Sequence, residues 1–280
     1  MGRITMRHRV AEFAADGAVF PAERVQAVEE PLEIQVNGRV FGTVMRTPGD
    51  DVELAIGLLL SAGAITSGDQ VFSGEFCPGT NDVGANTYNV LAMTLAPGLK
   101  PQAPGGIEAA AAASSLGVCG QSLIDAVCAA SAHHVTVAAQ DRTLGMTAQL
   151  AAEAGRLLGE QRPLFAKTGS TAAAALLDAA TGALLVVRED VHQARAVDKV
   201  VGWAAADGCI PLAGVVLVIS GAADFDGVQT ACMAGVSVVV SVGPPTSLAA
   251  QLADRAGMTL IAAMPDSSLV SFAGADRLTR

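Results

Sequence analysis

The second half of the chain contains several short, almost continuous runs of apolar residues, and these constrain the fold more than any other feature. Residues 214–220, 236–242 and 258–263 consist mainly of Val, Leu, Ile and Ala. A strand with one face in water alternates apolar and polar residues, whereas an uninterrupted run is typical of a strand covered on both faces. Segments with helical spacing, 226–234 and 247–256, separate the runs. The sequence therefore predicts an α/β domain with helices on both faces of its sheet.

The first hundred residues have a different pattern, which predicts a small α+β unit. Residues 32–36 alternate apolar and polar, Asn37-Gly38 is a strong hairpin signal, and residues 40–45 would form the returning strand. A turn at residues 47–51 opens a helix with carboxylates at its positive end. Residues 87–96 are expected to form another strand.

A segment rich in Pro and Gly, residues 97–106, is the expected linker between the two parts. The predicted units are therefore an N-terminal α+β unit at 1–96 and an α/β domain at 107–280. Residues 1–30 are expected to be a mobile or strand-like lead-in. Further elements are expected in the α/β domain. They are strands at 135–138, 164–166 and 183–188, an Ala-rich helix ending at Ala180, and helices from residue 121 or 122, at 146–158 and at 191–206.

Composition excludes several classes of partner. The formal net charge is −10, there are only three lysines, and 4% of the residues are aromatic, so a general nucleic-acid or anionic-membrane surface is not expected. No stretch of about 20 mostly apolar residues is free of breakers, so no membrane span is predicted. The five cysteines are scattered and odd in number, which favours a reducing cytoplasm over a disulfide scaffold.

Loops after the strands of an open α/β sheet are the usual ligand sites, and four such loops are candidates here. One of them, residues 188–191, ends a strand with adjacent opposite charges and could orient a polar ligand. Lys167, Thr168 and Gly169 open a turn that offers a cation, a hydroxyl and backbone N–H groups to an anion, although an ordinary capped turn explains it equally well. The turns at 220–224 and 243–247 are weaker candidates, for which ordinary turn chemistry is the better explanation.

Cys119 is the candidate nucleophile. Glycines flank it, and a helix is expected to begin directly after it. A thiol at a helix N-terminus has a lowered pKa and is present as the thiolate that nucleophilic or sulfur-transfer chemistry needs. The alternative is an inert buried cysteine, which is the commoner case. No metal site is predicted, because the sequence has no C-x-x-C and no H-x-E spacing. No G-x-S-x-G nucleophile elbow is present, which argues against a hydrolase.

Taken in order, the segments resemble motifs of the FdhD family, the formate dehydrogenase accessory sulfurtransferases. The resemblance covers nearly the whole chain. The matching segments include RTPGDD at 46–51, SSLGVCG at 114–120, KTGST at 167–171, REDV at 188–191, AVDK at 196–199 and AGMTL at 256–260.

The resemblance implies a cytidine-deaminase-like α/β domain without the deaminase zinc site. It also implies a cytoplasmic homodimer that accepts sulfur from a cysteine desulfurase as a persulfide, on Cys119 in this chain. The acceptor of that sulfur would be the molybdenum cofactor in its bis-guanine-dinucleotide form, destined for formate dehydrogenase. The residues expected at the cofactor are Lys167, Thr168, Gly169, Asp190, Lys199, Ser220 and Gly221.

The sequence departs from the family pattern where cations or a second thiol would stand. Leu116 replaces the first cysteine of the reactive loop, and Ala172 and Ala222 replace a histidine and an arginine. Charge-assisted bonds to phosphate are worth about 1.5–3 kcal/mol each, so losing several would weaken cofactor binding by orders of magnitude. The alternative function is therefore a catalytically degenerate paralogue that acts as a binding or assembly protein.

Overall fold

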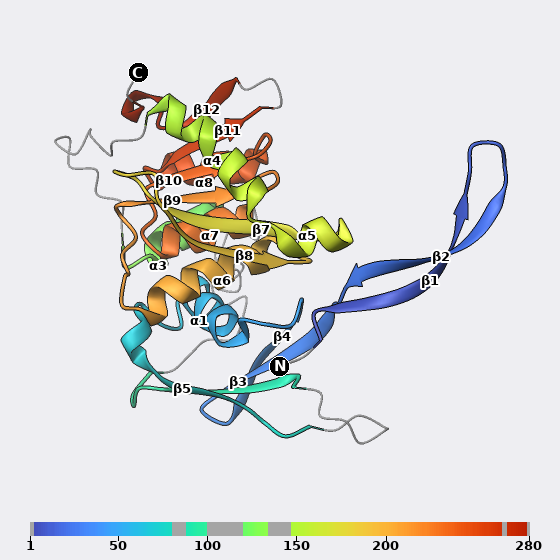
Figure 1. Cartoon of the computed structure of the whole chain (residues 1–280). Helices are drawn as coiled ribbons and strands as arrows, with labels where there is room; N and C mark the ends of the chain where they lie inside the picture. The colour runs from blue at the N-terminus through green and yellow to red at the C-terminus, as the bar shows by residue number, and fades with distance from the viewer. Residues whose placement is uncertain (1–2, 80–87, 100–119, 134–146, 265–267, 279–280) are drawn as a thin grey trace.

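The computed structural model describes residues 3–79, 88–99, 120–133, 147–264 and 268–278. These residues form three sheets and a set of helices (Figure 1). The predicted strand at 135–138 and residues 100–106 of the predicted linker lie outside the described residues. Among the described residues, no helix has the length and apolar character needed to cross a bilayer.

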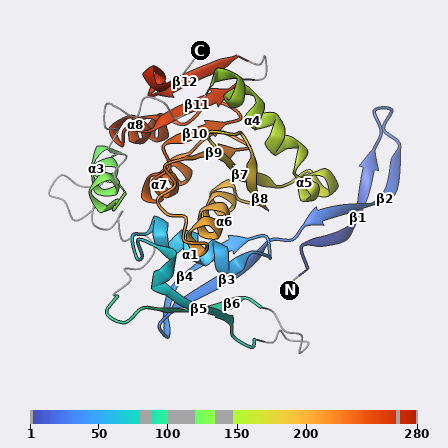
Figure 2. The same cartoon turned by 60° about the vertical axis from the view of Figure 1, so that its left-hand side comes forward.

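The first sheet is a hairpin of β1 (Thr5–Phe13) and β2 (Val19–Ala27), here called the arm, which extends away from the rest of the molecule (Figures 1 and 2). The strand-like alternative for the N-terminal segment is thus the one that the structure adopts. All nine residues of β1 pair with β2 in register.

The second sheet has the order β4-β3-β6-β5 and forms the N-terminal unit. It comprises β3 (Glu30–Val36), β4 (Arg39–Arg46), β5 (Val71–Phe76) and β6 (Val90–Leu95), with α1 (Asp51–Ser61) and a short 3-10 helix (Gly68–Gln70). The predicted hairpin at Asn37-Gly38 is confirmed, because both residues have the positive φ that the turn requires. Strand β5 was not predicted.

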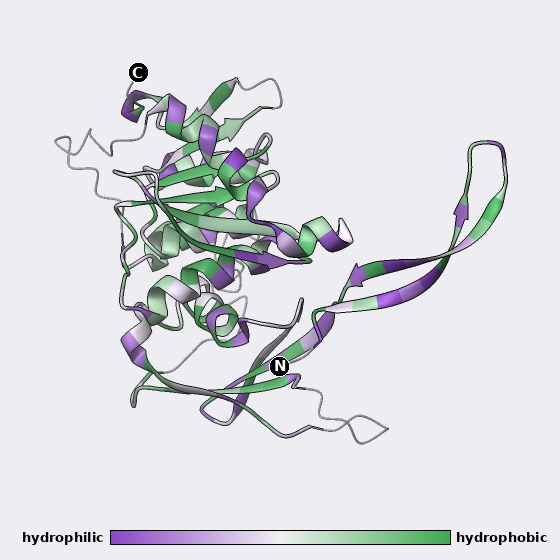
Figure 3. Cartoon of the chain, viewed as in Figure 1, coloured by the Kyte–Doolittle hydropathy of each residue, from purple (hydrophilic) through white to green (hydrophobic). Residues whose placement is uncertain are grey.

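The third sheet has six strands in the order β12-β11-β10-β9-β7-β8. Its strands are β7 (Ala172–Asp178), β8 (Leu184–Asp190), β9 (Val215–Ile219), β10 (Val238–Ser241), β11 (Thr259–Ala263) and β12 (Leu269–Ala273). Strands β9, β10 and β11 are parallel, and the other pairings are antiparallel. Figure 3 shows that the central strands are almost wholly apolar, as the sequence predicted.

Helices cover both faces of this sheet, which confirms the predicted α/β class. One face packs on α6 (Gln193–Ala206), α7 (Phe225–Met233) and α8 (Ser247–Arg255), and the other on α4 (Ala148–Glu160). Helix α3 (Gly120–Ala130) packs on α7 and α8, and α5 (Pro163–Thr168) lies beside the base of the arm. Helix α1 packs on α6 and joins the N-terminal unit to this domain.

Glycine allows α1 and α6 to pack backbone against backbone. A Cβ on Gly57 would lie 2.0 Å from the carbonyl oxygen of Asp198, and a Cβ on Gly202 would lie 1.8 Å from that of Glu53. Real Cβ atoms do not approach this closely, so any side chain would force the helices apart. Two glycines on facing helices therefore fix the distance between the two units.

Two predicted elements are wrong. The Ala-rich segment after Thr171 is strand β7, not a helix, and residues 164–166 belong to helix α5, not to a strand. Strand β7 lies between β8 and β9 with both faces covered, so its pairing and burial outweigh the helix propensity of alanine. Pro163 occupies the first turn of α5, where its missing N–H costs nothing.

Candidate functional site

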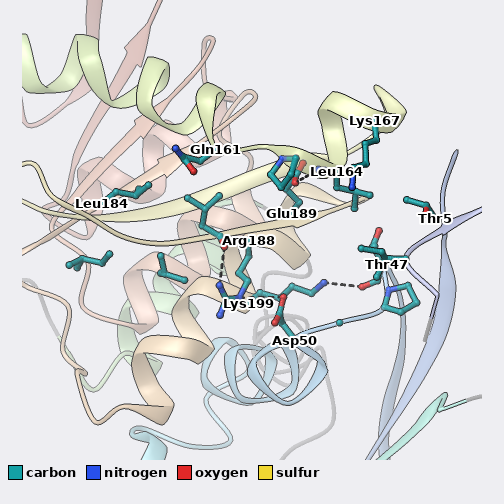
Figure 4. A pocket seen from close by; sticks show the side chains of 17 residues that line it. Thr5, Thr47, Asp50, Gln161, Leu164, Lys167, Leu184, Arg188, Glu189 and Lys199 are labelled. Carbon is teal, nitrogen blue, oxygen red and sulfur yellow. Dashed lines mark hydrogen bonds and ion pairs between the residues drawn. The ribbon is translucent and has the colours of Figure 1, made fainter. Parts of the chain in front are cut away.

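A groove of about 640 Å³ runs along β8, which is the edge strand of the six-stranded sheet among the described residues (Figure 4). Its walls come from β8, from α5, from the loop between β4 and α1, and from the base of the arm. The lining residues include Thr5, Thr47, Asp50, Leu164, Lys167, Leu184, Arg188, Glu189 and Lys199. Segments 46–51, 167–171, 188–191 and 196–199 are far apart in the sequence and contribute to one groove.

A fully buried ion pair lies beneath the groove. Lys199 Nζ is 2.8 Å from Asp190 Oδ2 and donates a hydrogen bond of 2.9 Å to the carbonyl oxygen of Thr47. The same Asp190 carboxylate accepts from the backbone N–H groups of Thr47 (3.1 Å) and His192 (3.0 Å). These bonds tie the loop before α1 to β8 and α6. Asp190 and Lys199 therefore shape the floor of the groove, and each is neutralised by the other.

Arg188 lines the groove and is also neutralised within the chain. Its guanidinium makes two hydrogen bonds to the Glu53 carboxylate, at 2.7 and 2.8 Å, and lies 3.4 Å from Asp50. Hydrogen bonding to Glu53 raises the pKa of Arg188, so the pair stays charged. Lys167, by contrast, is exposed and forms no ion pair with any described residue. Lys167 is thus the groove cation best placed to meet an external anion.

The turn that carries Lys167, Thr168 and Gly169 corrects one expectation. It follows helix α5 and precedes strand β7, so it lies at a helix C-terminus. The Gly169 N–H caps that helix by donating to the carbonyl oxygen of Phe165 at 2.7 Å, and the Thr168 hydroxyl donates to that of Leu164. Neither group is free for an anion in this arrangement. The Glu189 carboxylate caps the other end of α5 through the N–H groups of Leu164 and Phe165.

Ser220 and Gly221 follow β9, a central strand of the sheet, and do not line the groove. The hydroxyl of Ser220 accepts a hydrogen bond of 2.8 Å from the N–H of Ala173. The backbone N–H of Ser220 in turn donates a hydrogen bond to the carbonyl oxygen of Ala173. Gly221 lies against the side chain of Gln193 at the start of α6. The structure therefore separates the seven predicted cofactor residues into a group at the groove and a group at the β9 turn.

Cys119 lies outside the described residues, and the structure describes the chain from Gly120 onward. Gly120 begins α3 beside Leu248 in the first turn of α8, so the predicted helix directly after Cys119 is confirmed. Of the four described cysteines, only Cys209 is exposed. Cys232 is buried, which raises its pKa to about 11 and makes it a poor nucleophile.

A smaller cavity of about 170 Å³ lies between the N-terminal unit and helices α6 and α7. Asp198 is buried at its wall, 2.9 Å from Arg195 and hydrogen-bonded to Thr230 at 3.0 Å. Burial raises the pKa of Asp198 from 3.8 to about 6, and the nearby Arg195 opposes this shift. No group of three or more His, Cys, Asp or Glu side chains arranged to hold a metal occurs within the described ranges.

Sequence patterns did not reveal the partners of these charged residues. The Arg188–Glu53 pair joins positions 135 residues apart, and Thr47 meets Asp190 across 143 residues. Arg46, which is also buried, makes two hydrogen bonds to Asp51. Only the order of the motifs along the chain could have indicated that these residues gather.

The sequence from residue 27 to 279 matches the model of the FdhD/NarQ family. The chain belongs to this family. It is 41% identical over 286 residues to the sulfur carrier protein FdhD of Mycobacterium tuberculosis, with 100% of both chains covered. It is 38% identical over 278 residues to the protein of the same name from Streptomyces coelicolor, covering 99% of this chain and 97% of that one.

A solved structure shares the fold. The crystal structure of a protein from Desulfotalea psychrophila, described as a candidate formate dehydrogenase accessory protein, matches with a TM-score of 0.73. It covers 99% of this chain and 100% of that chain at 20% identity. At that identity the likeness supports the fold alone, and the sequence comparisons carry the family.

Proposed function

We propose that this FdhD/NarQ family member is a cytoplasmic, homodimeric sulfur carrier in the maturation of formate dehydrogenase. The observation that carries the proposal is the full-length similarity to proteins named sulfur carrier protein FdhD. The groove supports it, since four motif segments that prompted the resemblance meet there. Such a function requires a thiol that accepts sulfur and a site that receives the sulfur acceptor.

The accepting thiol is Cys119. Its thiolate would attack the outer sulfur of a persulfide on a cysteine desulfurase. A new S–S bond then forms on Cys119, the desulfurase cysteine leaves as its thiolate, and no net oxidation occurs. Cys232 is too deeply buried for this role, and burial also raises the pKa of Cys128.

Mass spectrometry of the intact protein, after incubation with a cysteine desulfurase and cysteine, tests this step. We expect a reducible gain of about 32 Da, the mass of one sulfur, in the unmodified protein and in Cys209→Ala, but not in Cys119→Ala. Cys209→Ala is the matched control because Cys209 is an exposed thiol. Loading that survives in Cys119→Ala and disappears in Cys209→Ala would contradict the proposal.

The sulfur acceptor would be the molybdenum cofactor in its bis-guanine-dinucleotide form, bound as a substrate at the groove. Lys167 is the exposed cation available to its phosphate oxygens, because Arg188 and Lys199 are neutralised by Glu53 and Asp190. Guanosine diphosphate is a suitable probe. A phosphate contact of about 1.5–3 kcal/mol predicts that Lys167→Ala weakens its binding about 10- to 100-fold and that Lys167→Arg retains it.

The same neutralisation favours a second candidate, a family member that binds or assembles a partner without transferring sulfur. With Arg188 and Lys199 engaged inside the chain, the groove offers little positive charge to a pyrophosphate. This candidate predicts no persulfide on Cys119 and binding of guanosine diphosphate that is insensitive to Lys167→Ala. Together the two assays separate the candidates.

A further inference from the structure

The smaller cavity, of about 170 Å³, lies where strand β4 and helices α1, α6 and α7 meet (Figure 2). Strand β4 and α1 belong to the N-terminal unit, whereas α6 and α7 cover the six-stranded sheet. Protein interiors are packed closely and contain few voids larger than a water molecule. A cavity of about 150 Å³ is large enough to hold benzene. The cavity at this junction can therefore receive a small molecule, and its lining determines which kind.

One part of the lining is polar and buried. It comprises Arg195 and Asp198 on α6 and Gln229 and Thr230 on α7. Asp198, Gln229 and Thr230 are almost wholly buried, and the side chain of Arg195 is 19% exposed, so solvent reaches it. Buried polar groups nearly always have hydrogen-bond partners. Thr230 follows this rule, because its hydroxyl donates to the Asp198 carboxylate at 3.0 Å.

Arg195 departs from the rule. Its Nη1 atom is buried and has no hydrogen-bond partner among the described residues, although it lies 2.9 Å from Asp198 Oδ2. The contact is therefore an ion pair in which this N–H group is not directed at the carboxylate oxygen. A guanidinium presents its donors in a planar fork that matches the two oxygens of a carboxylate. Arg195 thus has donor capacity left for a carboxylate that enters the cavity.

Another part of the lining is apolar. Phe41 and Val44 on β4 and Leu58 and Ala62 at α1 form it. An ion without a hydrocarbon part would gain nothing from this surface, and a wholly apolar ligand would leave the guanidinium without a partner. Small-molecule sites commonly combine an apolar lining with a few polar groups that fix the orientation of the ligand. This lining therefore suits a molecule with one carboxylate and a short hydrocarbon tail.

The carboxylates near Arg195 restrict the charge of the ligand. Asp198 and Asp226 both line the cavity, so a multiply charged anion such as phosphate is disfavoured. Burial raises the pKa of Asp198 to about 6, against the effect of Arg195, while Asp226 on α7 and Asp190 on β8 raise it further. The residues of β4 and α1 that line the cavity are uncharged. In mildly acidic solution the Asp198 carboxyl can therefore hold a proton and donate a hydrogen bond.

We propose that this cavity binds a short-chain monocarboxylate together with one proton. One ligand oxygen accepts from Arg195, the other accepts from the protonated carboxyl of Asp198, and the tail lies against Phe41 and Leu58. The proton comes from solvent, and no covalent bond forms or breaks. Because the walls come from both units, the bound ligand stabilises their junction. The inference does not rest on the proposed function, since neither Cys119 nor the groove takes part.

Calorimetry on the full chain with propionate as the probe tests the inference. Only chains with a protonated Asp198 bind, so the dissociation constant should be about 50- to 100-fold higher at pH 8 than at pH 5.5. At pH 7, heats measured in buffers of different ionisation enthalpy should show uptake of about one proton per propionate. Asp198→Asn, whose amide donates at any pH, should bind equally at both pH values without proton uptake. An affinity of the unmodified chain that does not change with pH would overturn the inference.

Three variants locate the site. Arg195→Gln keeps a polar side chain without the charge and should weaken propionate binding about 10- to 100-fold. Ala62→Leu fills the cavity without altering a polar group and should abolish binding. Arg255→Gln is the matched control, because Arg255 is an arginine on α8 whose side chain is 63% exposed, and it should bind as the unmodified chain does. Circular dichroism establishes that each variant is folded, and Ala62→Leu keeps the test decisive if Arg195→Gln is not.

Two further comparisons separate this cavity from the groove. Propionamide has the shape of propionate without its charge, and it should bind at least about tenfold more weakly. Lys167→Ala removes the exposed cation of the groove and should leave propionate binding unchanged. Propionate binding that is lost in Lys167→Ala but survives in Arg195→Gln would place the carboxylate in the groove and refute the inference. The absence of binding at every pH would refute it as well, since the cavity would then hold water alone.

Discussion

The buried ion pair between Asp190 and Lys199 leads to a testable prediction about how the two units are held together. Asp190 is completely buried, and its carboxylate has three partners: the Lys199 ammonium and the N–H groups of Thr47 and His192. Removing one partner of a buried pair costs about 3–5 kcal/mol, since the remaining charge is left in a medium that solvates it poorly. Asp190→Asn should therefore lower the free energy of unfolding by about that amount.

The two sides of the pair are not equivalent. Without Lys199, the carboxylate still accepts two backbone hydrogen bonds, at 3.1 and 3.0 Å. Without the Asp190 charge, the ammonium keeps only the carbonyl oxygen of Thr47 at 2.9 Å. Lys199→Met should thus be less destabilising than Asp190→Asn. The double variant, which leaves no unpaired charge, should be more stable than the sum of the single effects implies.

Urea unfolding of the unmodified protein, the two single variants and the double variant, followed by circular dichroism, measures these differences. Arg156→Ala is the control, because Arg156 pairs with Glu153 and Glu160 at an exposed surface and should show no measurable change. A loss below about 1 kcal/mol for Asp190→Asn would refute the reasoning. Strictly additive single effects would also refute it, since they would mean that Asp190 and Lys199 are not coupled.

Three further predictions concern the packing around the groove. Asp198→Asn should flatten the pH dependence of stability. Because the pKa of Asp198 is raised to about 6, the folded state loses about 2 kcal/mol of stability as pH rises from 4 to 7, and the urea midpoint of the unmodified protein, but not of the variant, should fall. Gly202→Ala should cost about 3 kcal/mol or more by forcing α6 from α1, whereas Gly159→Ala, at an exposed helix site with open space, should be neutral or slightly stabilising in thermal unfolding. Glu189→Gln should weaken the cap of α5 by about 1–2 kcal/mol, seen as faster amide exchange in residues 163–168.

Local sequence patterns predicted those elements that depend mainly on residues close together in the sequence. The Val-rich strands β9 and β10 and helices α6 and α8 were found because burial on both faces and helical spacing leave a direct trace in the sequence. The Asn37-Gly38 hairpin was found because its turn requires a positive φ at both residues.

The elements that the sequence did not predict depend on tertiary context. An alanine run forms strand β7 because β8 and β9 flank it and helices close both of its faces. The Lys167 turn was expected at a helix N-terminus, and that expectation failed with the assignment of the segment after it. Family resemblance located the segments of the groove, but it could not show that Asp190 and Lys199 would neutralise each other.

That neutralisation changes how charge in the groove should be counted. Lys167, Arg188 and Lys199 all line it, and each carries a positive charge that a phosphate could meet. In the folded chain, Arg188 is bonded to Glu53 and Lys199 to Asp190, so two of these cations hold the N-terminal unit against the sheet. If an anionic substrate drew on either cation, it would have to displace an internal carboxylate and loosen that junction. Binding at Lys167 requires no such change, and binding that depends on Lys167 is therefore the result that would mark the groove as a functional site.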